Sequence, residues 1–349
     1  MMGDWDLLVD RKDLRKAQIV PAQAPPLADG EVRLRVERFS FTANNVTYGL
    51  MGDSFGYWKF FPAPGGQGRI PVWGFATIVE SRVPEAPVGL RLFGYLPMSS
   101  AFTMQLAKGR TGFVDRAPHR ADLPPTYNAY AEAPADPLDD HRALLRPLLM
   151  TSFLLDDFLG EDANLKSLVL SSASSKTAMG LAWFAKARGL EVIGLSSPAN
   201  APAIAGLGLY DRVLTYDQVG SLKTAGPAAF VDFAGDRTTT AAVHAALGEA
   251  LTRSLIVGAT HWEAGREEAA IAGPTPTLFF APDQIRKRMA DWGPGEVEAR
   301  FDKGLRGFVA ANPWLTLVQH QGQQGLTDAY HQVLEGRVRP QDGHIITPG

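Results

Sequence analysis

The chain begins with segments in which apolar and polar residues alternate. Residues 31–41, EVRLRVERFSF, place Val32, Leu34 and Val36 between charged residues, which is the period of a half-buried strand. Residues 70–79 and 89–96 show a similar pattern, with Gly or Pro near their ends. We therefore predict a β-rich domain over residues 1–130.

A different pattern begins near residue 140. Residues 141–158 predict a helix, and five short apolar strands are expected after it, in SLVL, EVIGLS, RVLTY, AAFVDFA and SLIVGA. Residues 177–188 predict a helix between the first two strands, with Gly189 placed to end it. Repeated strand, helix, strand units predict a doubly wound parallel sheet, of the Rossmann type, over residues 131–312. Residues 130–139, rich in Ala, Pro and Asp, predict a linker before it.

Charge and composition narrow the classes of partner. The formal net charge is -3, from 34 Lys and Arg against 37 Asp and Glu, so no basic surplus indicates nucleic acid or an anionic membrane. The absence of Cys excludes disulfides, thiolate nucleophiles and zinc sites built on Cys. No apolar run reaches the length of a transmembrane helix, and MMGDWDLLVDRKDL does not resemble a signal peptide. We expect an unprocessed cytoplasmic chain.

The first turn of the predicted parallel sheet is SSASSKTA, residues 171–178, and such turns are where these sheets bind ligands. Dinucleotide-binding folds place glycines there, whereas this chain has Ser172, Ser175 and Ala178. A left-handed backbone costs a residue other than Gly roughly 1–2 kcal/mol, so we expect the loop to avoid those angles. The candidate ligands of a pyrophosphate are the hydroxyls and the amine of Ser172, Ser174, Ser175, Lys176 and Thr177.

Other readings of this turn remain open. Ser and Thr are also ordinary helix N-caps, and Lys176 is typical of a solvated first turn. A nucleoside triphosphatase loop is disfavoured because Ser175 and Leu170 stand where that motif needs Gly. The second strand ends in Ser196-Ser197, without the carboxylate that binds the ribose of NAD, and this favours NADP(H). Alternatively, Ser-Ser-Pro simply turns the chain.

The order of these parts resembles the zinc-independent medium-chain dehydrogenase/reductases, in their quinone oxidoreductase and enoyl reductase branch. The resemblance rests on DGEVRLRVERFSF, PVWGFATIVES, GLRLFGY, SSASSKTAMGLAWFAKARGLEVIGLSS, LGLYDRVLTYD, VDFAGD, LIVGATHW and LTDAYHQVLEGRVRPQDGHIIT. TANNVTYGLMGDSFGYWKFFPAPGG and APDQIRKR also resemble a branch of unknown function, DUF2855.

This resemblance implies a GroES-like catalytic domain over residues 1–130, completed by residues 313–349. It implies Tyr216 near the adenine side of the cofactor and Gly258, in LIVGATHW, among the cofactor contacts; His261-Trp262 would border the nicotinamide pocket. Phe75 stands where zinc-dependent relatives keep a ligand His, which together with the lack of Cys argues against catalytic zinc. A homodimer through edge strands of the cofactor domains is also implied.

Candidate catalytic residues lie in and after the loop that follows the first long strand. By resemblance, Asn44 and Thr47 fall on the family's Asn and Asp, and Tyr48 and Tyr57 are rival proton donors in the cleft between the domains. Two structural alternatives stand beside this interpretation. The aromatic residues from 48 to 61 would equally form a packing cluster, and the asparagines Asn44 and Asn45 are common turn caps.

The leading hypothesis is an NADPH-dependent reductase of an activated C=C bond in an enone, an enoyl thioester or a quinone. A Tyr or water would supply the proton while the nicotinamide supplies a hydride. A ketone reductase without metal is the nearest enzymatic alternative. Because the glycines of the phosphate loop are missing, a cofactor-free binding or scaffold protein on the same fold is the rival from another class.

Overall fold

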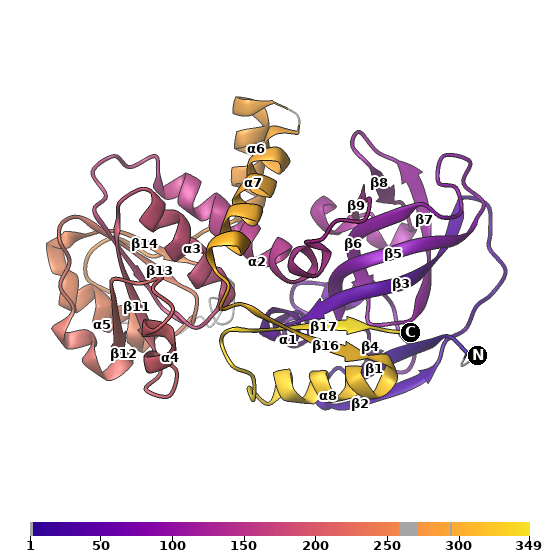
Figure 1. The fold of residues 1–349 in the computed structure, drawn as a ribbon, viewed down its shortest axis with the longest axis horizontal. Coiled ribbons are helices and arrows are strands. Elements are labelled where there is room, and N and C mark those ends of the chain that lie inside the picture. Colours follow the sequence, from indigo (N-terminus) through magenta and orange to yellow (C-terminus); the bar gives the residue numbers. More distant parts are fainter. Residues whose placement is uncertain (1–2, 258–270, 294) are drawn as a thin grey trace. The chain divides into compact units, whose positions relative to one another are not determined.

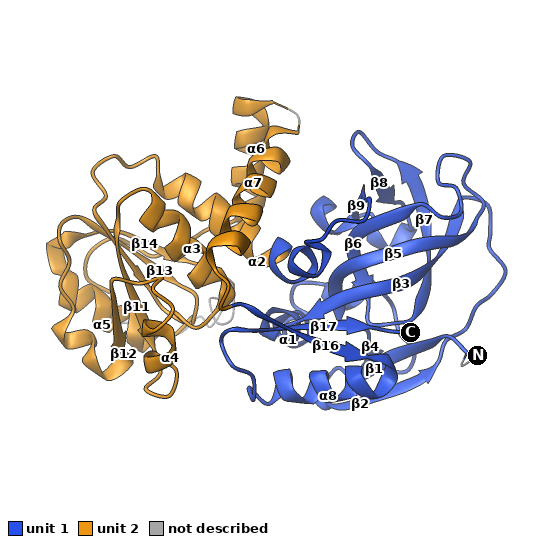
Figure 2. Cartoon of the chain, in the orientation of Figure 1, with its two compact units in different colours: residues 1–146, 315–349 blue, residues 147–314 orange. Residues whose placement is uncertain are grey.

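The structure is a computed structural model that describes residues 3–257, 271–293 and 295–349. The chain divides into two compact units: residues 1–146 with 315–349, and residues 147–314 (Figure 2). Each unit has its own sheets and its own buried apolar residues, so each is described separately.

Unit 1 is built around an antiparallel barrel. Its strands pair in the ring β3-β5-β6-β9-β8-β7, which closes because β7 also pairs with β3. The ring strands are β3 (Glu31–Phe41), β5 (Pro71–Ser81), β6 (Arg91–Pro97), β7 (Ala101–Lys108), β8 (Phe113–Asp115) and β9 (Ala129–Glu132). A smaller sheet has the order β2-β1-β4, from β1 (Trp5–Asp10), β2 (Asp13–Pro21) and β4 (Gln67–Gly68).

The C-terminal segment belongs to the same unit. Strand β17 (Asp342–Thr347) pairs antiparallel with β3, and β16 (Thr316–Gln321) pairs parallel with β17. Helix α8 (Gly322–Leu334) connects them, and its Tyr330 donates a buried hydrogen bond of 2.6 Å to the Leu14 carbonyl of β2. The remaining helical segments of this unit are α1 (Ala43–Leu50), η1 (Tyr57–Lys59), η2 (Pro118–Arg120) and η3 (Pro125–Asn128).

The alternation of apolar and polar residues in residues 31–41 places the apolar side chains on the buried face of β3, as its period predicts. Val32, Leu34 and Val36 are buried and face the main core of unit 1, while Arg35 between them is exposed. Gly74 of β5 approaches β3 so closely that a Cβ there would lie 2.2 Å from the Arg38 carbonyl oxygen. A residue without a side chain at this position therefore allows the two strands to pair.

Unit 2 is a six-stranded parallel sheet of order β12-β11-β10-β13-β14-β15 with helices α3, α4 and α5 around it (Figure 1). Its strands are β10 (Ser167–Leu170), β11 (Glu191–Ser196), β12 (Arg212–Thr215), β13 (Ala228–Asp232), β14 (Leu251–Ile256) and β15 (Thr277–Leu278). Its helices are α3 (Lys176–Ala187), α4 (Ala201–Ala205), η4 (Tyr216–Ser221), α5 (Arg237–Leu247), η5 (Gly248–Ala250), α6 (Ala281–Trp292) and α7 (Glu296–Ala311). The strand order reverses between β10 and β13, which is the point where such sheets bind ligands.

These two architectures confirm the predicted fold class, an α/β chain with a GroES-like β-rich part and a Rossmann sheet. The predicted linker over residues 130–139 is wrong. Part of it forms β9, which pairs with both β6 and β8, and Asp139 is buried in an ion pair of 2.8 Å with Arg91. The division between the units falls later, inside helix α2 (Asp139–Leu159), just before Pro147.

Among the residues that the structure describes, no helix combines the length and the apolar character that a membrane span needs.

Candidate functional site

The turn after β10 adopts the conformation that we expected it to avoid. Ser172 has φ 46°, and it is the one residue other than Gly with positive φ in the described part of the chain. The expectation was wrong because neighbouring groups hold this residue in place. Its amide donates to the Tyr216 hydroxyl at 3.0 Å, and its carbonyl accepts from the Ser175 amide at 2.8 Å. Strain of this kind is found at ligand-binding turns.

The same turn is tied to the second strand. The Ala173 amide donates to the Leu195 carbonyl at 2.9 Å, and the Tyr210 hydroxyl donates to the Ala173 carbonyl at 2.8 Å. A Cβ at Gly194 would lie 2.8 Å from the Ala173 Cβ and 2.9 Å from the Tyr210 ring. Glycine on β11 therefore allows Ala173 of the turn and the Tyr210 ring to pack closely against this strand.

Helix α3 begins at this turn and presents backbone donors. Ser175 is its N-cap, and the Ser175 hydroxyl accepts from the Ala178 amide at 3.2 Å, as the N-cap alternative predicts. Within the described residues, the amides of Ser174 and Thr177 have no hydrogen-bond partner. Free amides at a helix N-terminus, together with the helix dipole, favour an anion. Lys176 occupies the first helical position.

The two serines at the end of β11, for which the sequence suggested one shared role, differ in burial. Ser196 is buried and its hydroxyl has no partner among the described residues, whereas Ser197 is partly exposed. A phosphate arriving from solvent would therefore meet Ser197 first. Within β11 itself, the one carboxylate, that of Glu191, stands at the opposite end of the strand from Ser196.

A buried pair at the switch point was missed by the sequence analysis. The Ser171 hydroxyl donates to Asp232 Oδ1 at 2.6 Å and accepts from the Phe233 and Ala234 amides. Asp232 also accepts from the amides of Ala234 and Gly235, which fixes the turn after β13. SSASS and VDFAGD contained both residues, but their pairing across parallel strands is visible only in the fold.

Three residues that the resemblance assigned to the cofactor side lie outside the described residues. These are Gly258, His261 and Trp262.

In unit 1, helix α1 carries three of the four candidate catalytic residues, and Tyr57 lies on η1. Asn44 Nδ2 donates to the Tyr48 hydroxyl at 2.8 Å, so these two candidates are in contact. Thr47 is not part of this contact, because its hydroxyl donates to the Ala43 carbonyl at 3.3 Å. Asn45 takes the capping role, since its Oδ1 accepts from the Thr42 amide and its Nδ2 donates to the Pro71 carbonyl.

Tyr48 and Tyr57 lie together in an aromatic cluster. Their ring centroids are 4.6 Å apart, and Tyr127 of η3 lies 6.4 Å from Tyr48 and 6.0 Å from Tyr57. The other aromatic residues of the cluster are Phe60, Phe61, Trp73, Phe75, Phe93, Tyr95 and Phe102. It therefore contains the two rival donors and also packs as the structural alternative predicts.

Burial sets the acidity of these tyrosines. It raises the pKa of Tyr48 and of Tyr57 above the ordinary value of 10.0. The neighbouring Tyr127 side chain acts in the opposite sense and lowers the pKa of both groups. The pKa of Tyr127 itself is raised well above the ordinary value, chiefly by burial. All three hydroxyls are thus protonated at neutral pH, as a proton donor requires.

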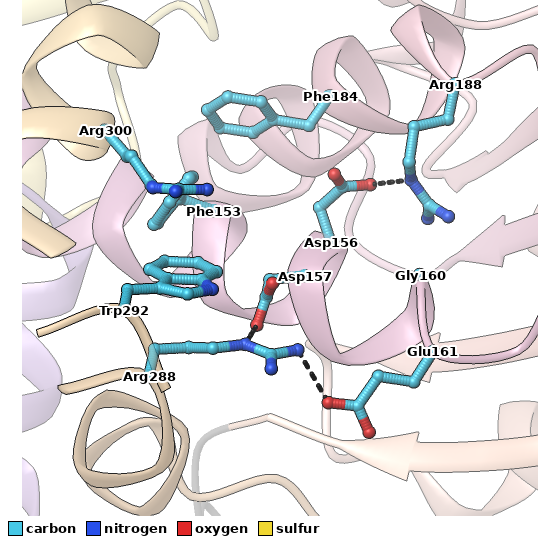
Figure 3. A pocket seen from close by; sticks show the side chains of 10 residues that line it. All are labelled: Phe153, Asp156, Asp157, Gly160, Glu161, Phe184, Arg188, Arg288, Trp292 and Arg300. Atoms are coloured by element: carbon cyan, nitrogen blue, oxygen red, sulfur yellow. Dashed lines mark hydrogen bonds and ion pairs between the residues drawn. The ribbon is translucent and has the colours of Figure 1, made fainter. Parts of the chain in front are cut away.

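Unit 2 has a pocket of about 420 Å³ that is lined by residues of α2, α3, α6 and α7 (Figure 3). Its arginines are already paired with carboxylates. Arg188 contacts Asp156 at 2.8 Å, and Arg288 contacts Asp157 at 2.5 Å and Glu161 at 2.7 Å. A ligand entering the pocket would have to displace these ion pairs. We therefore interpret the ion pairs of Arg288 as structural contacts between α6 and the C-terminal end of α2.

Groups of three or more His, Asp or Glu able to hold a metal ion are absent from the described residues.

Comparison with known proteins places the chain in a family. A family model described as "Protein of unknown function (DUF2855)" matches residues 39–339. The chain belongs to the DUF2855 family. That description groups relatives without stating a reaction.

Among curated proteins, the DUF2855 chain is 28% identical over 315 residues to the spectinabilin polyketide synthase system protein NorB of Streptomyces orinoci. The match takes in 84% of this chain but spans only 12% of the length of NorB.

Solved structures share the fold of the DUF2855 chain. CurA from Vibrio vulnificus in complex with NADPH matches with a TM-score of 0.68 and 15% identity, over 99% of each chain. The CurK enoyl reductase matches with a TM-score of 0.64 and 13% identity, over 100% of each chain. These likenesses confirm the resemblance to medium-chain reductases at the level of the fold.

Proposed function

We propose that this protein is an NADPH-dependent reductase of an activated C=C bond in an enone, an enoyl thioester or a quinone. The observation that carries the proposal is the turn after β10. It combines a left-handed Ser172 and the N-terminus of α3 at the switch point of a parallel sheet. The amides of Ser174 and Thr177 there have no hydrogen-bond partner among the described residues. Such a turn suits a pyrophosphate.

The residues of unit 2 fit this cofactor. Ser172, Ser174, Ser175, Lys176 and Thr177 would surround the pyrophosphate, with Tyr216 beside them through its contact with the Ser172 amide. Ser197, partly exposed at the end of β11, would meet the 2′-phosphate. When bound, NADPH supplies a hydride to an electrophilic carbon.

The residues of unit 1 fit the acid that such a reduction needs. Asn44 donates to the Tyr48 hydroxyl and so leaves that hydroxyl free to donate its own proton onward. Tyr57 is partly exposed and is therefore the hydroxyl that a substrate reaches more easily. CurA, named as a complex with NADPH, and CurK, named as an enoyl reductase, support this choice of reaction by likeness of fold.

The activity is tested by incubating the purified protein with NADPH and following loss of reduced-nicotinamide absorbance. A panel of enones, quinones and enoyl thioesters is compared with saturated ketones. Faster turnover of the conjugated acceptors than of the ketones supports the proposal. Turnover of ketones alone would favour the zinc-independent ketone reductase.

The cofactor assignment has its own test at Ser197. Ser197→Glu places a carboxylate at the end of β11, where it repels a 2′-phosphate, so NADPH should bind at least about tenfold more weakly. Ser221→Glu adds the same charge at an exposed position of η4 and serves as the matched control. Equal effects of the two variants on the NADPH dissociation constant would remove Ser197 from the site.

A cofactor-free binding or scaffold protein is the second candidate. It is favoured by the buried Ser196 hydroxyl and by the absence of glycine from the turn, where Ser172 carries the strain. Failure of both NADPH and NADH to bind would select this candidate.

We also propose that the protein forms a homodimer through the cofactor units. Among the described strands, β15 lies at the edge of the parallel sheet, and the apolar side chains of Leu278 and Phe280 are exposed there. Light scattering coupled to size exclusion measures the mass, and a monomer at micromolar concentration would contradict the dimer.

A further inference from the structure

We infer that Arg120 is a positioning residue that anchors the turn carrying Tyr57 to the barrel of unit 1, so that the Tyr57 hydroxyl is presented to substrate in one place. This inference rests on the proposed reduction, in which Tyr57 is the more accessible of the two proton donors. No sequence motif indicated Arg120, which lies 63 positions after Tyr57 along the chain.

The Arg120 side chain is buried and paired. The residue is 1% exposed, and its Nη1 lies 3.2 Å from Asp115 Oδ2. Its Nε donates to the Phe60 carbonyl at 3.0 Å, and its Nη1 donates to the Tyr130 hydroxyl at 3.1 Å. The Tyr130 hydroxyl in turn donates to the Tyr95 carbonyl of β6 at 2.7 Å. A buried guanidinium with these partners is a fixed point of the structure, because moving it would leave a buried carboxylate unpaired.

Phe60 joins this fixed point to Tyr57. The Phe60 amide donates to the Tyr57 carbonyl at 3.3 Å, which closes the single turn η1, and the Phe60 carbonyl accepts from Arg120. The guanidinium carbon of Arg120 also lies 4.5 Å from the centre of the Phe61 ring and 5.5 Å from that of Phe60. The C-terminal end of the turn that carries Tyr57 is thus held by a hydrogen bond and by ring contacts with one side chain.

Arg120 also holds the segment that flanks Tyr57. Asn128 Nδ2 donates to the Arg120 carbonyl at 3.1 Å, which ties the end of η3 to η2. Helix η3 carries Tyr127, whose ring meets the Tyr57 ring edge-on at 80°, with the centroids 6.0 Å apart. The turn that carries Tyr57 and the aromatic neighbour on which Tyr57 packs are therefore both attached to Arg120.

The shape of the guanidinium carries this role, because Asp115 offsets its charge. A guanidinium presents its donors in fixed directions, and here they reach Phe60 and Tyr130 at once. A lysine ammonium keeps the charge beside Asp115 but has no donor at the position of Nε. Arg120→Lys therefore removes the anchor and keeps the cation.

Two variants test the anchor without leaving a single buried charge. Arg120→Lys keeps a cation beside Asp115, and the double variant Asp115→Asn with Arg120→Met removes both charges and carries the test where the lysine variant does not fold. Arg33→Lys is the matched control. The Arg33 side chain is largely buried and pairs with Glu80 at 3.0 Å, between β3 and β5 and outside the turn that carries Tyr57.

The experiment follows Tyr57 directly. 3-Fluorotyrosine is placed at position 57, and its ionisation is followed by fluorine NMR as pH is raised, in the parent protein, in the Arg120 variants and in Arg33→Lys. Because burial holds the pKa of Tyr57 above its ordinary value of 10.0, release of the turn into water should lower the pKa at position 57. Arg33→Lys should leave it where it is.

Kinetics provide the second measurement. With NADPH and a conjugated acceptor, loss of the anchor should lower kcat by about tenfold or more while KM changes little, since a misplaced proton donor affects the transition state more than binding. Arg33→Lys should keep the kcat of the parent. Thermal unfolding establishes which variants are folded.

The outcomes separate the anchor from the proposed function. An unchanged pKa at position 57 in a folded Arg120 variant, or the same shift in Arg33→Lys, overturns the inference whether or not the protein proves to be a reductase. A lowered pKa with an unchanged kcat also overturns it, because the position of Tyr57 would then not matter to the reaction. A lowered pKa with no reductase activity in the parent supports the anchor and removes only the proposed function.

Discussion

At the level of single residues, the sequence predicted where the turn that contains Ser172 lies but not the backbone conformation of Ser172. The position of the turn after β10 follows from a strand, small residues and a helix, and the structure contains the turn. Its backbone angle did not follow, because the cost of left-handed φ for Ser was weighed without the bonds that Tyr216 and Ser175 supply. Those partners lie 44 residues away and within the turn itself.

Substitution of Ser172 by Gly should remove this strain. Relief of a left-handed serine exceeds the entropy that glycine adds to the unfolded chain, so Ser172→Gly should stabilise the protein by up to about 1 kcal/mol. Ser174→Gly is the matched control, since Ser174 does not have positive φ and should lose stability on substitution. Urea unfolding measures both. A loss of similar size in the two variants would show that Ser172 is not strained.

At the level of elements, the positions of strands were predicted better than the boundary between the two units. The prediction for residues 31–41 coincides with β3, because alternation reports directly which side chains are buried. The linker prediction failed because Ala, Pro and Asp are typical of loops, yet here Asp139 pairs with Arg91 and residues 129–132 pair with two strands. Strand β15 was missed, since two exposed residues carry no period.

Strand β16, at the edge of its sheet, and its neighbour β17 should respond to acid. His320 Nε2 and His344 Nδ1 are 2.9 Å apart, so one nitrogen donates and the other accepts. Burial lowers the pKa of His320 below its ordinary value of 6.5, and Asp328 opposes this shift. Protonation therefore favours the unfolded chain, and the contribution of His320 to stability is complete above pH 6.5 and is lost as the pH falls below it.

Thermal unfolding across this pH range tests the histidine pair. The melting temperature should fall by a few degrees as the pH is lowered from above to below 6.5. The fall should be smaller in His320→Gln than in the parent, while His119→Gln, at an exposed position, should behave like the parent. An identical pH response in all three proteins would contradict a role for the pair.

At the level of the whole molecule, the sequence indicated two architectures and a family. The fold confirmed the architectures, and the match to the family model confirmed the family. The candidate site was recovered only in part. Asn44, Tyr48 and Tyr57 are close in sequence and were found together, whereas Tyr95, Tyr127 and the pair Ser171 and Asp232 are assembled by strand pairing and helix placement. Contacts of this kind have no local pattern, so no reading of neighbouring residues predicts them.

The most direct test of the account is isothermal titration of the purified protein with NADPH and then with NADH in the same buffer. A pyrophosphate site at the turn after β10 with Ser197 beside the 2′-phosphate should give micromolar binding of NADPH, with NADH at least about tenfold weaker, a difference of about 1.4 kcal/mol. Binding of neither nucleotide would make the turn after β10 a structural feature and would contradict the proposed reductase.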